Sequence, residues 1–186
     1  MVYNSKPLRT KEQINDVLFY LRRTKHPERD TFLFLIGINT GLRCSDIVKL
    51  KIGTLRQLPQ PVIVEQKTGK KRILYLNEMV PVVEKYIEGK KDDEWAFPSM
   101  YDKNTHITRD NVYRLFHRID KQLGHIGFTT HTMRRTFGYW YYKRTKNIYF
   151  LMQLFNHSNE EITKRYIGLT DEELGQSLEG FKLGFQ

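Results

Sequence analysis

Cysteine is almost absent from this chain of 186 residues, in which Cys44 carries the only thiol. One thiol cannot form an internal disulfide, and it cannot supply the paired thiolates of a metal cluster. Long apolar runs and a signal-peptide pattern are missing as well, which argues against a membrane span and against export. We therefore expect a soluble, cytoplasmic protein with no membrane partner.

Two further absences narrow the chemistry. The sequence has no G-x-x-x-x-G-K-[ST] loop, which would bind the phosphates of a nucleotide. His106, His117 and His125 lie close together in the chain, but none has a carboxylate or thiolate at the spacing of a metal site. We expect these histidines to be structural or exposed, and we expect the protein to use no metal and no cofactor.

Positive charge, in contrast, is plentiful. The chain has 31 Lys and Arg residues against 21 Asp and Glu residues, for a net charge of +10. This excess indicates a polyanionic partner, most simply nucleic acid, although a merely soluble basic protein would carry the same charge. With 39% hydrophobic residues the chain has enough apolar material for a packed core. We expect one domain over residues 1–186, with its core over about 10–168.

Apolar periodicity and capping motifs predict a mainly helical chain. From Pro61 the period changes to two, over residues 62–67 and again over 72–76, with Thr68-Gly69 between them. That pattern predicts a β-hairpin. The expected fold class is therefore mainly α with a small antiparallel β-sheet (α+β). Helices are expected over about 11–23, from 27 to a stop at Gly41, from 44 or 45, after Asn77, and over 108–124, 130–144, 147–155, 158–166 and 170–185.

Several polar residues lack an easy structural explanation. Arg43 follows a buried helix and the turn at Gly41, where the alternative interpretation is a surface arginine that caps the helix end. His131 and Arg134 stand three positions apart, so they project from one face of a helix.

A second unit follows, in which Tyr166 stands nine positions after His157. Ser158 and Glu161 fit the capping box S-x-x-E, which predicts that a short helix begins directly after His157. Gly168 would end that helix and leave the phenol of Tyr166 at a mobile terminus.

The predicted hairpin has a basic tip. Lys67, Lys70, Lys71 and Arg72 crowd there, with Lys67 as the innermost member. One interpretation is an ordinary charged hairpin end that discourages aggregation of strand edges. The other is a finger that reaches a phosphate backbone, for which we expect Lys70, Lys71, Arg72 and also Arg135 to be DNA-contacting residues.

Together these residues suit phosphate chemistry. Two arginines, Arg43 and Arg134, can clamp the non-bridging oxygens of a phosphodiester. Tyr166 can attack phosphorus and form a phosphotyrosine. Lys67 can protonate the departing 5′ oxygen, while histidines accept the phenol proton or donate to the phosphate. Our catalytic candidates are thus Arg43, Lys67, His131, Arg134, His157 and Tyr166.

The same residues resemble the catalytic domain of the tyrosine recombinases, also called the phage integrase family. The family's T-G-L-R-x-S-[ED]-[IL] segment is matched by residues 40–47, and its hairpin lysine by Lys67. Its H-x-x-R motif is matched by residues 131–134, and its second histidine and nucleophile by His157 and Tyr166. The resemblance covers most of the chain, from about residue 10 to residue 168.

Three departures from the family pattern stand out. Met133 and Arg135 occupy the third and fifth places of the usual H-x-L-R-H, and Asn156 replaces the glycine of L-G-H. None of these changes removes a catalytic group. The family's separate N-terminal DNA-binding domain has no counterpart here, so we expect either a fragment of a longer integrase or a naturally minimal enzyme.

The resemblance implies a site-specific recombinase or integrase of a phage or mobile element, acting on double-stranded DNA without metal or ATP. It also implies a homo-tetramer on DNA, with the segment 170–185 as a C-terminal helix that docks on a neighbouring protomer. The alternatives are a type IB topoisomerase-like activity and a noncatalytic DNA-binding protein on the same fold.

Overall fold

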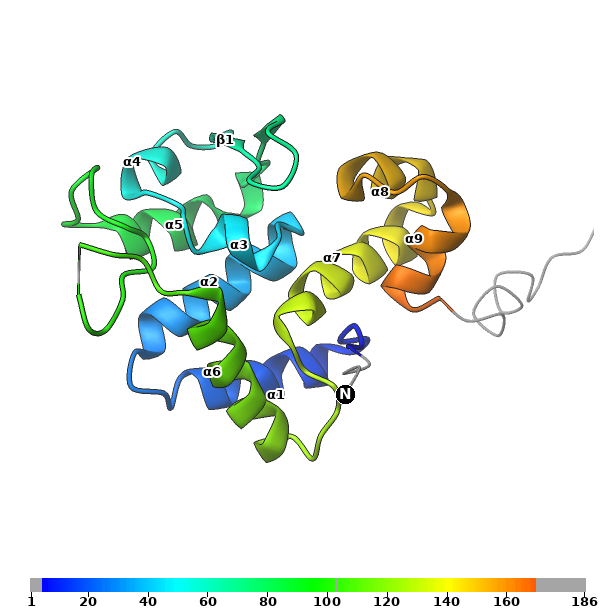
Figure 1. Ribbon diagram of the computed structural model, residues 1–186, viewed down its shortest axis with the longest axis horizontal. Coiled ribbons are helices and arrows are strands. Elements are labelled where there is room, and N and C mark those ends of the chain that lie inside the picture. The colour runs from blue at the N-terminus through cyan, green and yellow to red at the C-terminus, as the bar shows by residue number, and fades with distance from the viewer. Residues whose placement is uncertain (1–4, 103, 170–186) are drawn as a thin grey trace, which may run out of the picture.

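Helices dominate the computed structural model, which describes residues 5–102 and 104–169 (Figure 1). Within these residues the strands form one two-stranded antiparallel sheet, so the predicted fold class is confirmed. In chain order the elements are α1 (Lys11–Leu21), α2 (Pro27–Thr40), α3 (Cys44–Ile47), α4 (Ile52–Leu55), β1 (Val62–Val64), β2 (Lys71–Ile73), the 3-10 helix η1 (Asn77–Met79), α5 (Val80–Ile87), α6 (Arg109–Gln122), α7 (Thr130–Thr145), α8 (Ile148–Phe155) and α9 (Glu160–Ile167).

The first helix follows its capping motif. The Thr10 hydroxyl accepts a hydrogen bond from the Gln13 amide over 3.2 Å, and the Gln13 side chain accepts one from the Thr10 amide. This reciprocal pair fixes the start of α1. The helix ends at Leu21, two residues earlier than the periodicity predicted.

The second helix ends as predicted at Gly41, whose φ of 61° is readily adopted only by glycine. A Cβ at this position would lie 2.5 Å from Cδ1 of Phe137 on α7. Gly41 therefore serves both the turn and the close packing of α7 against α2. This packing brings the loop that carries Arg43 next to the helix that carries Arg134.

Two apolar clusters hold these elements. The larger one packs α1, α2, α5 and α6 together and includes Phe34, Phe97 and Phe116, all fully buried. The smaller one joins α8 and α9 to the second half of α7 through Leu151 and Phe155. In Figure 1, α8 and α9 lie at one end of α7, and the hairpin faces α8 from the main body. The site described below is built where these two parts meet.

The hairpin is present but shorter than predicted. Val62, Ile63 and Val64 pair with Ile73, Arg72 and Lys71, and no further pairs form between the described strands. Glu65 to Lys70 make the turn instead, closed by a 2.8 Å bond from the Gly69 amide to the Glu65 carbonyl. Beyond β2 the Leu74 and Leu76 amides still donate to the Pro61 and Pro59 carbonyls over 2.9 and 3.0 Å. The two prolines have no amide to return these bonds, so the regular ladder ends there.

The start of the last described helix also differs from the prediction. Asn159, not Ser158, caps α9, because its side chain accepts from the Ile162 amide over 2.9 Å. The helix therefore begins at Glu160 and ends at Gly168, whose φ is 78°. Tyr166 lies within the last turn, and its ring is half-buried rather than at a mobile terminus.

The C-terminal helix expected over 170–185 lies outside the described residues. None of the helices over 5–102 and 104–169 is long and apolar enough to cross a membrane.

Candidate active site

Arg43 lies at the turn from α2 into α3, as the sequence predicted. Its Nη1 is 3.0 Å from Glu65 Oε2, and its Nη2 donates to the Phe155 carbonyl over 3.5 Å. The side chain remains 21% exposed. The guanidinium is thus oriented by protein groups yet reachable from solvent.

Arg134 is more deeply buried, with 4% of its surface exposed. Its Nη1 donates to the Gly41 carbonyl over 2.5 Å, and its Nη2 donates to the Leu154 carbonyl over 3.4 Å. Consecutive carbonyls at the end of α8 therefore accept from both arginines, where a helix carries partial negative charge. Burial lowers the pKa of Arg134 to about 10, so the guanidinium stays charged at neutral pH.

Glu65 connects Arg43 to the hairpin, a role that the sequence did not predict. Its carboxylate is 3.0 Å from Arg43 and 3.1 Å from Arg72, and it accepts from the Thr68 hydroxyl over 3.0 Å. Burial opposes ionisation, but the hydrogen bonds from Arg72 and Thr68 and the charge of Arg43 outweigh it and lower the pKa. The missed signal was an acidic residue at the turn of the hairpin, two positions before Lys67.

Tyr166 and His157 lie against one another. Their ring centroids are 5.1 Å apart at an interplanar angle of 75°, and Phe155 contacts both rings edge-on. Arg135 lies 4.7 Å over the Tyr166 ring, so it faces the candidate nucleophile. The structure thus brings together Arg134 and Arg135 from α7, His157 from the loop between α8 and α9, and Tyr166 from α9.

The pKa values of this pair shift in opposite directions. Burial raises the pKa of Tyr166, although Arg134, Arg135 and Arg43 act against the rise. Burial lowers the pKa of His157, and the charges of Arg134 and Arg43 lower it further. At neutral pH the phenol therefore keeps its proton and the imidazole is neutral, so a proton acceptor is ready beside a proton donor.

Thr163 lies beneath His157 and is fully buried. Its hydroxyl is 3.0 Å from His157 Nδ1 and 3.3 Å from the Asn159 carbonyl. The sequence reasoning gave this threonine no role.

His131 occupies the first turn of α7, one turn before Arg134, and its side chain is exposed. Desolvation lowers its pKa, as do the charges of Arg135, Arg109 and Arg134. Its ring has no ring contact with Tyr166 among the described residues. The charges that act on His131 thus come from α7 and from the start of α6.

The basic hairpin tip divides into two kinds of residue. Lys67 and Lys71 are exposed, and Lys70 reaches across to Asn156 at the end of α8 over 3.3 Å. Arg72 is internal: its side chain is 11% exposed, pairs with Glu65 and donates to the Thr40 carbonyl. We expected Arg72 to face DNA, but the structure turns its side chain inward to Glu65. Lys67 makes no hydrogen bond or ion pair with the described residues, so the structure connects it to Arg43 only through the hairpin and Glu65.

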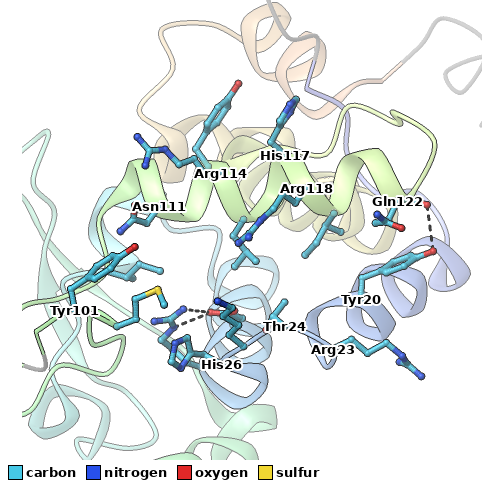
Figure 2. A pocket seen from close by; sticks show the side chains of 18 residues that line it. Tyr20, Arg23, Thr24, His26, Tyr101, Asn111, Arg114, His117, Arg118 and Gln122 are labelled. Atoms are coloured by element: carbon cyan, nitrogen blue, oxygen red, sulfur yellow. Dashed lines mark hydrogen bonds and ion pairs between the residues drawn. The ribbon is translucent and has the colours of Figure 1, made fainter.

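A groove of about 760 Å³ lies between the α1–α2 connection and α6, and none of its described lining residues comes from the hairpin, α7, α8 or α9 (Figure 2). In Figure 2, Arg114, His117 and Arg118 extend from α6, while Tyr20 and Arg23 come from the opposite side. The cationic residues that line it are Arg23, Lys25, Arg29, Arg114 and Arg118, against the single carboxylate of Asp30. Arg29 is paired with that carboxylate at 2.7 Å, and Arg23 lies 3.4 Å over the Phe19 ring, so both of these arginines already have partners within the protein. The sequence hinted at this surface only through the spacing of Arg114 and Arg118, one helical turn apart.

The described residues contain no group of three or more His, Cys, Asp or Glu side chains that could hold a metal ion.

Comparisons with known proteins agree with the fold. A family model described as the Phage integrase family matches residues 8–173. The probable integrase/recombinase YoeC of Bacillus subtilis (strain 168) is 38% identical over 168 residues, which cover 90% of this chain and 91% of YoeC. Tyrosine recombinase XerA of Saccharolobus solfataricus is 29% identical over 164 residues, which cover 87% of this chain but 52% of XerA. The Tn1549 transposon integrase, solved with circular intermediate DNA, has a TM-score of 0.66 and 20% identity, over 92% of this chain and 64% of that one.

Proposed function

The chain belongs to the phage integrase family, and from this premise we propose that it is the catalytic part of a site-specific DNA recombinase that cuts and rejoins double-stranded DNA through a phosphotyrosine at Tyr166. The family match supports the class of reaction. The convergence of two arginines on the end of α8, next to the paired rings of His157 and Tyr166, is the observation that carries the assignment of the site.

The proposed cleavage step is a displacement at phosphorus. Arg43 and Arg134 bind the non-bridging oxygens of the scissile phosphate. The Tyr166 hydroxyl attacks, its proton passes to His157, and the new bond joins Tyr Oη to the 3′ phosphate as the bond to the 5′ oxygen breaks. Lys67 gives its proton to the departing 5′ oxygen, and His131 donates to the phosphate as charge develops on it.

Rejoining reverses these steps with a 5′ hydroxyl from another strand. The phosphotyrosine conserves the energy of the phosphodiester bond, so neither ATP nor a metal ion has to supply it. Exchange between two duplexes requires several active sites, and we propose a homo-tetramer assembled on DNA in the cytoplasm.

The basic groove extends the proposed DNA contact beyond the scissile phosphate. Arg109 at the start of α6 is close enough to His131 to lower its pKa, so α6 starts beside the catalytic residues. Arg114 and Arg118 continue along the same helix into the groove. We propose that this face follows the phosphate backbone, with Lys70 and Lys71 binding it from the hairpin.

The proposal is tested by trapping the covalent intermediate. A pool of nicked suicide duplexes with a randomised central segment is incubated with the protein, and adducts that survive denaturation are collected and sequenced. Wild type and the control Tyr149→Phe, whose ring is exposed outside the site, should both form adducts. Tyr166→Phe should form none while still retaining duplex DNA on a filter.

Three outcomes would contradict the proposal. If wild type retained DNA but formed no adduct with any duplex in the pool, the protein would be a noncatalytic binder. If Tyr166→Phe still formed adducts, another residue would be the nucleophile. Relaxation of supercoiled plasmid without strand exchange between selected sites would indicate a topoisomerase.

A further inference from the structure

We propose that Thr163 is a positioning residue that holds His157 in the form with a proton on Nδ1 and thereby directs Nε2 toward the reacting groups. The inference rests on the proposed function, in which His157 accepts the proton of Tyr166. It concerns the hydrogen bond behind the ring rather than any group that touches DNA.

The hydroxyl of Thr163 lies between two hydrogen-bond partners, the Asn159 carbonyl and His157 Nδ1. Thr163 is a helical residue whose hydroxyl lies 3.3 Å from the Asn159 carbonyl, four positions earlier in the chain. The Asn159 carbonyl can only accept, and donation of the hydroxyl proton to the carbonyl four positions earlier is the common arrangement for threonine within a helix, so we assign the Thr163 proton to Asn159. The Thr163 oxygen is then an acceptor toward His157 Nδ1, 3.0 Å away, and Nδ1 must carry the proton.

A proton on Nδ1 of His157 leaves a lone pair on the other ring nitrogen, Nε2. In a neutral imidazole with a proton on Nδ1, Nε2 has a free lone pair and is the basic nitrogen. The edge-on packing of the His157 ring against Phe155 and Tyr166 restricts its rotation. The combination of a fixed ring and a fixed proton therefore provides one acceptor, Nε2, for the phenol.

The surroundings of Thr163 would also accommodate an apolar side chain. Thr163 is fully buried and stands one helical turn before Ile167, a member of the smaller apolar cluster, and valine would fill the same space. An exposed position would allow water to replace the hydroxyl, but at this depth its loss leaves Nδ1–H without an acceptor. We therefore assign the hydroxyl the role of hydrogen-bond acceptor for His157 and not a role in packing.

The matched variants are Thr163→Val, which keeps the shape and removes the acceptor, and Thr163→Ser, which restores it. In protein labelled with ¹⁵N-histidine, the imidazole nitrogens of His157 are assigned by comparison with His157→Gln. Wild type and Thr163→Ser should show the proton of the neutral ring on Nδ1. In Thr163→Val this preference should be lost, and the His157 pKa should fall, because an acceptor at Nδ1 stabilises the charged ring more than the neutral one.

The kinetic arm uses a duplex selected with wild type. Thr163→Val should slow single-turnover adduct formation by roughly tenfold or more and move the acid side of its pH–rate profile to lower pH, while Thr163→Ser keeps both close to wild type. A merely structural threonine would change the melting temperature and leave the position of the acid side unchanged.

The outcomes separate the two proposals. A neutral His157 protonated on Nε2 in wild type, or a Thr163→Val variant with unchanged tautomer and pKa, overturns the role of Thr163 whatever the protein does to DNA. Failure of wild type to form adducts overturns the proposed function, while the spectra still report on the hydrogen bond.

Discussion

Tyr166 and His157 are an acid and a base whose pKa values burial moves apart, upward for the phenol and downward for the imidazole. In the free protein the proton therefore stays on Tyr166. In the complex that we propose, a phosphodiester would add a negative charge between Arg43 and Arg134 and so counter the two charges that depress the His157 pKa. The imidazole of His157 would then become a better proton acceptor when DNA is bound, and Tyr166 would keep its proton in the free protein.

DNA cleavage should be lost at acidic pH and not at basic pH. The pKa of His157 lies below its ordinary value, and only the neutral ring accepts a proton, so the rate stays level near neutrality and falls as the pH drops through that pKa. Adduct formation at subsaturating protein, measured between about pH 5 and about pH 8, reports this value for the free enzyme. A rate that rises on acidification would show that His157 acts as a charged donor and not as the base.

Lys67 can be tested as a general acid through its leaving group. Lys67→Ala should reduce adduct formation by about a hundredfold on an ordinary duplex, because the departing 5′ oxygen then leaves without a proton. On a duplex with sulfur in place of that oxygen the deficit should largely disappear, since a thiolate leaves readily without protonation. Lys71→Ala, an exposed lysine of the same hairpin, is the control and should show no such dependence. Equal deficits on both duplexes would restrict Lys67 to binding.

Glu65 attaches the hairpin to the loop that carries Arg43. Removal of this buried carboxylate in Glu65→Ala leaves Arg43 and Arg72 facing one another without a counter-charge. We expect a loss of about 3 kcal/mol in the free energy of unfolding, by analogy with other broken buried ion pairs. Urea denaturation measures it, with Glu88→Ala at an exposed position as the control. An unchanged midpoint would mean that Arg43 and Arg72 find other partners.

Most elements could be predicted because their signals are local. Thr10 and Gln13 form the expected capping box, and Gly41 ends α2 as its conformational freedom suggested. The errors came where neighbouring residues compete and where a partner residue lacks a donor. Asn159 caps α9 in place of Ser158, and Pro59 and Pro61 have no amide to continue the ladder opposite Leu74 and Leu76.

The candidate site shows the same division. The motifs indicated which charged residues belong together, but not which partners would hold them. Glu65 and Thr163 act through contacts across 22 and 6 positions of sequence, which periodicity cannot reveal. Arg72 looked like its neighbours on the hairpin tip, yet the strand's alternation turned it inward to Glu65.

For the whole molecule, the net charge of +10 is consistent with a long-range attraction to DNA, but its distribution decides where the duplex lies. The groove of Figure 2 concentrates cations of α6 and the α1–α2 connection on one face. Phosphate contacts of this kind carry no sequence information. They would orient any duplex toward the catalytic residues and leave the choice of site to other contacts.

The double variant Arg114→Gln/Arg118→Gln should therefore weaken binding to specific and random duplexes by a similar factor. Each lost phosphate contact removes about one released counterion, so the slope of log affinity against log salt should decrease in magnitude by about two. The control is Arg144→Gln/Lys146→Gln, which removes the same charge from exposed positions at the far end of α7, beside α8. If both double variants changed the slope equally, net charge alone would attract the DNA. A change confined to the groove variant would instead place the duplex along α6, and reduced adduct yield at high salt would then follow from binding and not from chemistry.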